Sequence, residues 1–314
     1  MKNICLIFVF LDSVVLGRQI LWELLPDIIL IVKRNIFGIL FFFVYTRFMF
    51  ESFILGAVQG IAEWLPISSE AMIVLVKTNF FPSGMIFSEV ISYAIFLHLG
   101  TLAAVIVYYR KTVLRLGSEL FKYRSLEKSK KNYLNFIIIA TVVSGILGLI
   151  LLKIVETNAS WFTNEMSVNI IVALFLSITA VLLYLTEKKQ TNNNVILTKD
   201  RAIITGLFQG IAAIPGISRS GSTVAGMGLL GIDKERALEL SFILSIPIVL
   251  LANIILNYSE FFNFTLNHFI ALSSAFIFGL LTIELLLRIV RKITFSYFVG
   301  IFAILLIIIT FVLS

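Results

Sequence analysis

Two clusters of polar side chains stand out in this chain because their residue types suit the chemistry of phosphate groups. The first has Gln59 and Glu63 on one helix face and, after Pro66, three polar residues at the start of a second short helix: Ser68, Ser69 and Glu70. The second adds an arginine and several hydroxyls, after Pro215-Gly216, to a matching glutamine: Gln209, Ser218, Arg219, Ser220, Ser222 and Thr223.

A hydroxyl-rich helix start with an arginine is a binding site for anions. Free amides and the helix dipole attract negative oxygens, and a guanidinium binds phosphate through two hydrogen bonds. Glu63 would repel that anion unless it held a divalent metal ion or acted as an acid or base. The pairing predicts phosphate chemistry with a metal in a membrane. The alternatives are a structural ion pair between Glu63 and Arg219, and packing or capping for each single hydroxyl.

The two clusters lie in segments that read alike, about 150 residues apart. Each segment begins with Gly-x-x-Gln-Gly-Ile-Ala, at Gly56 and at Gly206, and ends in a proline followed by polar residues. This repetition predicts an internally duplicated protein whose clusters meet in one site. The alternative is a coincidental match between two unrelated amphipathic spans.

The composition is that of a membrane protein. A mean hydropathy of +1.03, with 59% hydrophobic and 14% charged residues, exceeds what a soluble domain could bury. The apolar runs are long and continuous, which predicts an all-α helical bundle. One cysteine, Cys5, excludes an internal disulfide and any multi-cysteine metal site. The basic residues behind the net charge of +7 lie in short loops. This favours a role as topology signals and contacts with lipid headgroups over the binding of nucleic acid.

Six spans of about 20 residues follow the first cluster, at roughly 88–108, 133–153, 166–186, 236–258, 268–288 and 294–313. The loops between them alternate in charge. Lys and Arg are frequent in loops 110–131, 187–201 and 288–292, whereas 154–165 and 259–267 contain none. The positive-inside rule places the first three loops in the cytoplasm and the other two outside, together with the C-terminal Ser314.

This orientation makes segment 202–235 enter and leave on the cytoplasmic face, so we expect a re-entrant hairpin. Segment 53–84, broken at Pro66 and closed by Pro82 and Gly84, is expected to be the same hairpin entering from outside. Each half is then one hairpin plus three transmembrane helices, and the halves form an inverted-topology repeat.

We expect a single membrane domain over residues 49–314, with repeat 1 at about 52–187 and repeat 2 at about 202–313. Residues 1–48 are apolar but interrupted by charges, and they fit this plan poorly. They add one or two spans, or they are an upstream extension with Met49 as the start. A cleaved signal peptide is less favoured, because no small-residue cleavage site follows a clean apolar core.

At these residues the chain resembles the undecaprenyl-diphosphate phosphatase family of the bacitracin-resistance type. The first motif is matched by Gln59, Glu63, Leu65-Pro66 and Ser68-Ser69, and the second in full by Pro215-Gly216-Ile217-Ser218-Arg219-Ser220-Gly221-Ser222-Thr223. His98-Leu99-Gly100-Thr101, Ser241-Phe242 and Pro247 are also similar, and the resemblance covers about residues 50–314. It implies a membrane enzyme that removes the terminal phosphate of a C55-type polyprenyl diphosphate with a divalent cation, Mg²⁺ or Ca²⁺.

The resemblance also implies roles for individual residues. Glu63 would be the metal-linked or acid/base carboxylate beside Gln59, Ser69 the nucleophile and Arg219 the diphosphate clamp. The binding residues would be Gln59, Ser68, Gln209, Ser218, Ser220 and Thr223. The expected partners are the polyprenyl diphosphate, membrane lipids and, as an allowed assembly, a second copy in a homodimer. Nucleic acid is not expected, and the expected location is the plasma membrane.

One residue departs from the family pattern. The family continues its Ser-Ser motif to a histidine, a proposed catalytic group, where this chain has Met72. Glu70 is the nearest replacement, because a carboxylate could activate a serine or water. His98 ranks after it, since a mid-span histidine is more often a buried hydrogen-bonding residue, and His268 is interpreted as structural.

Two other functions remain open from the sequence. A carrier or flippase for polyprenyl phosphate would suit an inverted repeat and the loss of the histidine, and it would need Arg219 but no nucleophile. A transporter of small anions is a third interpretation and would show no dependence on prenyl chain length. Phosphate release in detergent separates the phosphatase from both.

Overall fold

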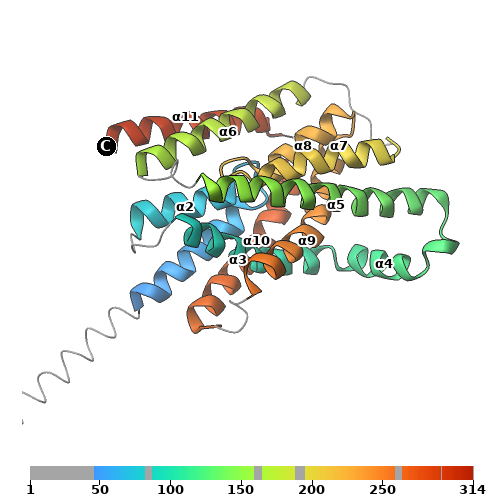
Figure 1. The fold of residues 1–314 in the computed structure, drawn as a ribbon, viewed down its shortest axis with the longest axis horizontal. Coiled ribbons are helices and arrows are strands. Elements are labelled where there is room, and N and C mark those ends of the chain that lie inside the picture. Colours follow the sequence, from blue (N-terminus) through green and yellow to red (C-terminus); the bar gives the residue numbers. More distant parts are fainter. Residues whose placement is uncertain are drawn as a thin grey trace, which may run out of the picture. The chain divides into compact units, whose positions relative to one another are not determined.

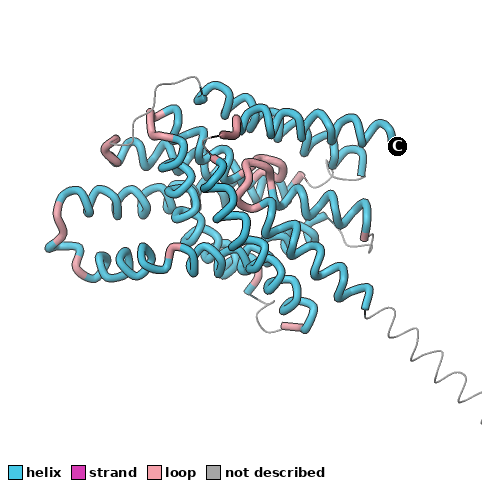
Figure 2. The backbone as a smooth tube through the Cα atoms, turned by 180° about the vertical axis from the view of Figure 1, so that it is seen from behind, coloured by secondary structure: helices cyan, strands magenta, loops and turns pink. Residues whose placement is uncertain are grey.

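The computed structural model describes residues 46–81, 87–158, 165–187, 195–258, 264–290 and 292–313, and these contain helices but no strand (Figure 2). The chain divides into two compact units, Met1–Phe50 and Glu51–Ser314, and the fold below is that of the second unit. The prediction for residues 1–48 falls almost entirely outside the described residues, as do Pro82, Gly84 and Ser314.

Among the described residues, six helices are long and apolar enough to cross a membrane, which confirms the six predicted spans (Figure 1). They are α3 (Phe87–Tyr108), α5 (Lys128–Thr157), α6 (Glu165–Glu187), α9 (Lys234–Leu256), α10 (Leu266–Ile289) and α11 (Phe295–Leu313). The closest helix pairs are α6 with α11, α5 with α7 and α3 with α10. The protein is therefore an all-α multi-pass membrane protein, as the composition predicted.

The duplicated segments form pairs of short helices that meet at a turn. In the first, a helix over 46–62 leads through a turn into α2 (Ser69–Phe80). In the second, α7 (Lys199–Gly210) and η3 (Ile211–Ala213) lead into α8 (Arg219–Leu229), which packs against α7. Helices of 11 or 12 residues are about 18 Å long and cannot cross a core of about 30 Å. The break in each segment is confirmed, whereas the re-entrant hairpins and their entry from opposite faces stay predictions.

Each turn forms where the sequence carries a helix-breaking residue. The first helix ends at residue 62, four residues before Pro66, because the residue that precedes a proline is disfavoured in helical conformation. The second turn contains Gly216 with φ of +101°, a left-handed conformation that favours glycine. Ser68 and Ser218 then start α2 and α8 as N-caps, so both predicted helix starts are confirmed.

The glycines of the repeated motif allow close approach of helices in both segments. Cβ atoms at Gly56 and Gly60 would lie 2.1 Å from the Ala271 carbonyl oxygen and 2.7 Å from that of Ala275, both on α10. At Gly206 a Cβ would lie 2.7 Å from the Ala140 carbonyl oxygen on α5. The same motif therefore seats each first helix against a long helix of the other half of the chain.

Gly56→Ala is expected to destabilise the protein strongly, because the new methyl group would meet the backbone of α10, which cannot move aside like a flexible side chain. We expect a loss of about 2 kcal/mol or more in the free energy of unfolding. Thermal unfolding in detergent measures it. The matched control is Gly117→Ala in α4, where no atom lies within 4 Å of the added Cβ and about 0.5–1 kcal/mol of stabilisation is expected. Equal melting temperatures for the two variants would contradict this packing.

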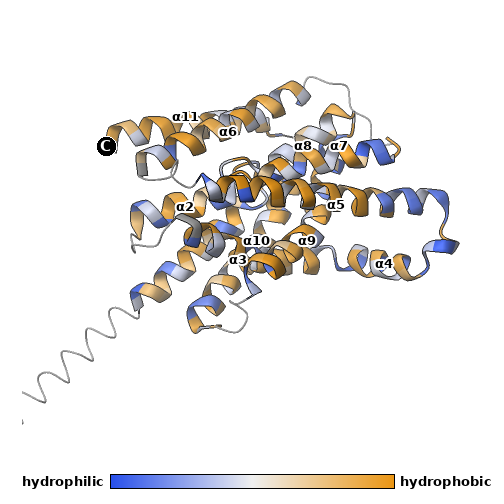
Figure 3. Cartoon of the chain, viewed as in Figure 1, coloured by the Kyte–Doolittle hydropathy of each residue, from blue (hydrophilic) through white to orange (hydrophobic). Residues whose placement is uncertain are grey.

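The basic loop predicted over 110–131 contains two helices, which the sequence interpretation did not include. They are α4 (Arg110–Phe121) and η1 (Tyr123–Ser125). The segment carries apolar residues at helical spacing between its charged residues. The guanidinium carbon of Arg115 lies 5.9 Å from the centre of the Tyr133 ring on α5. Figure 3 shows the hydrophilic residues gathered where α4 and α5 are joined.

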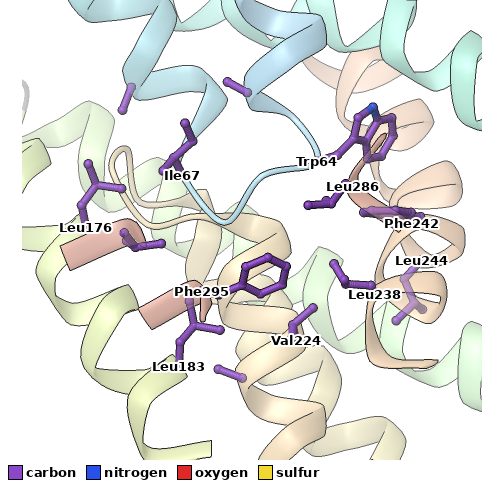
Figure 4. Packing of buried hydrophobic residues seen from close by; sticks show 14 of the residues in the cluster. Trp64, Ile67, Leu176, Leu183, Val224, Leu238, Phe242, Leu244, Leu286 and Phe295 are labelled. Atoms are coloured by element: carbon purple, nitrogen blue, oxygen red, sulfur yellow. The ribbon is translucent and has the colours of Figure 1, made fainter. Parts of the chain in front are cut away.

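The apolar core surrounds both turns. Figure 4 shows Trp64 next to Phe242 of α9, and Ile67 pointing toward Leu176 of α6. Trp64, Phe242 and Leu176 are at most 1% exposed. The polar residues of both turns are therefore held by tightly packed neighbours, which fixes their positions in the interior of the bundle.

Candidate active site

An ion pair between Glu63 and Arg219 joins the two polar clusters. Arg219 is the first residue of α8, and its guanidinium donates through Nη2 to Oε1 of Glu63. Glu63 lies just after the first helix, where its amide still donates to the Gln59 carbonyl oxygen at 3.0 Å. The predicted meeting of the clusters in one place is thus observed, with Glu63 only 5% exposed.

The second oxygen of Glu63 is surrounded by donors. Oε2 accepts from the Gln59 amide at 2.9 Å and from the Ser69 hydroxyl at 2.7 Å. Nε2 of His98 lies 3.0 Å from the same oxygen. Both oxygens of this carboxylate are therefore engaged by side chains of the protein, which is how a buried charge is stabilised.

His98 is part of this cluster, although the sequence interpretation ranked it below Glu70. Its Nδ1 lies 2.7 Å from the Ala94 carbonyl oxygen, and since a carbonyl only accepts, Nδ1 carries a proton. Its other ring nitrogen, Nε2, faces Glu63 and lies 3.4 Å from the Ser69 hydroxyl. A titratable residue in the middle of an apolar span was the signal that could have placed it in the site.

Four of the predicted substrate-binding hydroxyls make hydrogen bonds to the backbone around the two turns. Ser68 and Ser218 accept from the amides of Ala71 and Gly221 at 3.3 and 3.1 Å. Ser220 donates to the Leu65 carbonyl oxygen at 2.7 Å, and Thr223 donates to the Arg219 carbonyl oxygen at 2.6 Å. In this arrangement they hold the turns in place, and their contact with a substrate stays a prediction.

The two glutamines are equivalent in sequence but have different partners. Gln59 donates to Glu63, whereas Gln209 donates to the Ser144 hydroxyl of α5 at 2.9 Å. Oε1 of each is buried and accepts no hydrogen bond from the described residues. The free atom of Gln209 is therefore an acceptor, which suits a water molecule or a ligand hydroxyl better than a phosphate oxygen.

A cavity of about 210 Å³ opens beside the ion pair. Its lining includes the charged residues Glu70, His98 and Arg219 and the polar residues Ser144, Gln209 and Asn253. The other lining residues are mostly apolar, and many of them come from α5 and α9: Gly145, Gly148, Leu149, Leu152, Ile248, Leu251, Ala252, Ile255 and Leu256. A cavity lined by a few charged residues and many apolar ones fits an amphiphile with an anionic head and a hydrocarbon tail.

Comparison with known proteins places this site in a family. A family model described as "Bacitracin resistance protein BacA" matches residues 52–309, which include both polar clusters, five of the six spans and most of α11. The chain belongs to the BacA family.

Curated relatives extend the match over most of the chain. A protein of Methanococcoides burtonii is 41% identical over 79% of this chain and 93% of its own length. Proteins of Methanosphaera stadtmanae and Treponema denticola are 34% and 37% identical over 84% and 80% of this chain, and over 98% and 92% of their own lengths. All three are named "Undecaprenyl-diphosphatase".

The resemblance implies a divalent cation at this site. Within the described residues of this BacA-family chain, no group of three His, Cys, Asp or Glu side chains could hold a metal ion. Glu63 is already engaged by four side chains, but Glu70 makes no hydrogen bond to the described residues and lines the cavity. Mg²⁺ is commonly held by one or two carboxylates together with substrate phosphates. The residues fit a cation that arrives with a diphosphate and is bound by Glu70.

Proposed function

We propose that this protein is a membrane phosphatase that hydrolyses a polyprenyl diphosphate, of the undecaprenyl type, to the monophosphate and inorganic phosphate. The observation that carries the proposal is the cavity, whose lining combines Arg219 and His98 with apolar residues of α5 and α9. The names of the relatives support the same substrate class. Removing the terminal phosphate returns the lipid carrier to its monophosphate form for glycan synthesis.

The reaction begins with Ser69 as the nucleophile. Its oxygen attacks the terminal phosphorus, the bond from that phosphorus to the bridging oxygen breaks, and the prenyl monophosphate leaves with the bonding electrons. Water then attacks the phosphoserine, releases inorganic phosphate and restores the hydroxyl. Arg219 and the free amides at the starts of α2 and α8 balance the charge on the phosphoryl oxygens.

Glu63 and His98 accept and donate the protons of the reaction. The Ser69 hydroxyl already donates to Glu63 at 2.7 Å, so this carboxylate receives the proton as the oxygen attacks. Attraction between Glu63 and Nε2 of His98 at 3.0 Å requires a proton between them, and this proton can be given to the departing monophosphate oxygen. His98 thus occupies the role that Met72 cannot fill, and its contact with Ser69 supports it over Glu70.

A bound Mg²⁺ or Ca²⁺ would neutralise the diphosphate and polarise its oxygens. Glu70 is the carboxylate we assign to it, in place of Glu63. The protein lies in the plasma membrane with its C-terminus outside the cytoplasm in this proposal, and its halves are inverted repeats. The reciprocal contacts of Gly56 and Gly206 support that symmetry. A homodimer is compatible with the proposal but is not needed to complete the site.

Phosphate release from a C55 diphosphate by the purified protein in detergent tests the proposal, with and without Mg²⁺ or Ca²⁺. Release that depends on the cation is the expected result. Transport cannot occur in detergent, so the absence of release with intact binding of the lipid would instead indicate a carrier for polyprenyl phosphate. The hydrogen bond between Ser69 and Glu63 favours the enzyme, because a carrier has no use for a nucleophile.

His98→Gln is expected to lower kcat, whereas Glu70→Gln is expected to weaken the binding of the cation. Removing His98 should lower kcat by about 10²–10³ at any cation concentration, the range for loss of a general acid or base. Removing Glu70 should raise the cation concentration needed for half-maximal rate by about 10- to 100-fold, with a smaller change in kcat. Steady-state rates over a series of Mg²⁺ concentrations measure both. A kcat that falls by 10² or more in Glu70→Gln at saturating Mg²⁺, with His98→Gln unaffected, would reverse the assignment.

A further inference from the structure

The guanidinium of Arg219 is held by three groups from three parts of the chain. It donates to Glu63, and its Nη1 donates to the Ser241 carbonyl oxygen of α9 at 3.0 Å. Its central carbon also lies 5.8 Å from the centre of the Trp64 ring. The hydrogen bonds use the N–H groups of the guanidinium, whereas the contact with Trp64 places its central carbon over the aromatic ring.

Trp64 itself is fixed from several sides. The ring is 1% exposed, its indole N–H donates to the Gly279 carbonyl oxygen of α10 at 3.1 Å, and Phe242 meets it edge-on at 4.9 Å (Figure 4). The ring therefore has one position, set by α9 and α10, in which it presents itself to Arg219.

A diphosphate has to compete with Glu63 for the edge of the guanidinium, since anions bind to its N–H groups. It does not compete with Trp64, because the ring accepts neither of the two hydrogen bonds that Arg219 donates and its own N–H donates to Gly279. The contact with Trp64 can therefore persist while the N–H groups turn from the carboxylate to the phosphate.

We propose that Trp64 is a positioning residue that keeps the plane of the Arg219 guanidinium fixed while its hydrogen bonds pass from Glu63 to the substrate. The inference rests on the proposed function only in that Arg219 binds the diphosphate. It assigns to Trp64 a role in substrate affinity, in addition to its place in the core.

The test measures the Kd of the full-length protein in detergent for a methylene-bridged prenyl diphosphonate, which cannot be hydrolysed. Trp64→Leu is expected to weaken binding about ten-fold and Trp64→Phe about two-fold, since phenylalanine keeps an aromatic face. In an Arg219→Gln background, Trp64→Leu should cause no further loss. With the diphosphate substrate, KM should rise by the same factors while kcat changes less than two-fold.

The matched control is Phe136→Leu, which removes another aromatic ring that is 1% exposed, on α5, and should leave Kd unchanged. Trp64→Leu binding as tightly as the unmodified protein would overturn the proposal. The proposal would also be overturned if Trp64→Leu and Phe136→Leu weakened binding equally. The same holds if Trp64→Leu weakened binding as much in the Arg219→Gln background as in the unmodified protein, because core damage would then explain the effect. Trp64→Phe, the milder change, gives the same comparison where the leucine variant does not fold.

The binding measurement also separates this proposal from the proposed function. Arg219-dependent binding of the diphosphonate without any phosphate release would refute the phosphatase and leave the role of Trp64 intact. Binding that is unaffected by Arg219→Gln would refute the role of Trp64, whether or not phosphate is released.

Discussion

Ser69→Ala is expected to abolish phosphate release and leave the protein folded and able to bind the diphosphate. The variant removes the oxygen that attacks phosphorus, so the remaining groups can bind the substrate but cannot form the phosphoserine. We expect kcat to fall by at least about 10⁴, in line with the loss of a nucleophile in other enzymes that act through a covalent intermediate. Inorganic phosphate released at saturating C55 diphosphate measures it.

Ser68→Ala is the matched control, because it removes the neighbouring hydroxyl. Ser68 caps α2 and contacts the Ala71 amide, so its loss should cost about 1 kcal/mol of stability with little change in kcat. Trapping a phosphorylated protein by rapid acid quench, with label on Ser69 and not on Ser68, gives a second readout. Substantial activity in Ser69→Ala would mean that water attacks the diphosphate directly.

Arg219→Gln and Glu63→Gln are each expected to lower kcat/KM by about 10³ or more and to destabilise the fold. The catalytic loss follows from removing the cation that balances phosphoryl charge or the carboxylate that takes the serine proton. The structural loss follows because each change leaves a charge in the interior without its partner, at a cost of about 3 kcal/mol. Detergent unfolding and steady-state kinetics on the same preparations measure the two effects.

The double variant separates these contributions. Removing both charges should cost less stability than the sum of the single changes, while activity stays as low as in the worse single variant. Arg288→Gln is the control, since its pair with Glu284 on α10 is exposed at 72% and 46% and should contribute less than about 1 kcal/mol. Additive stability losses for Glu63 and Arg219 would mean that the buried ion pair contributes no more than the exposed one.

Sequence patterns were sufficient for the elements and for the residues that form the ion pair. Long apolar runs predicted α3, α5, α6, α9, α10 and α11, because a helix that crosses a bilayer needs about 20 consecutive apolar residues and loops rarely contain such a run. The repeated motif predicted that the turns at Pro66 and Pro215 would bring Glu63 and Arg219 together. The apolar runs and the repeated motif depend on local composition and on internal symmetry, which can be read directly from the sequence.

The directions of individual side chains depend on neighbours that are distant in sequence. Nothing near His98 indicates that α3 turns it toward Glu63, 35 residues earlier in the sequence. The hydroxyl of Ser220 belongs to the motif predicted to bind phosphate, yet it donates a hydrogen bond to the Leu65 carbonyl oxygen in the other turn. Predictions of which residues lie in the site were therefore more complete than predictions of what each atom contacts there.

The packing of Gly56 against Ala271 has a consequence for the synthesis of the chain. These residues are 215 positions apart, so at about 5–20 residues per second the first helix waits roughly 10–40 s for α10 to be made. Glu63 also lacks Arg219 until 156 more residues have been made, and a lone carboxylate is costly in hydrocarbon. The second segment meets no such delay, since Gly206 packs on α5, which already exists. We therefore expect the first turn to reach its final packing only after α10 has been made, later than the second turn.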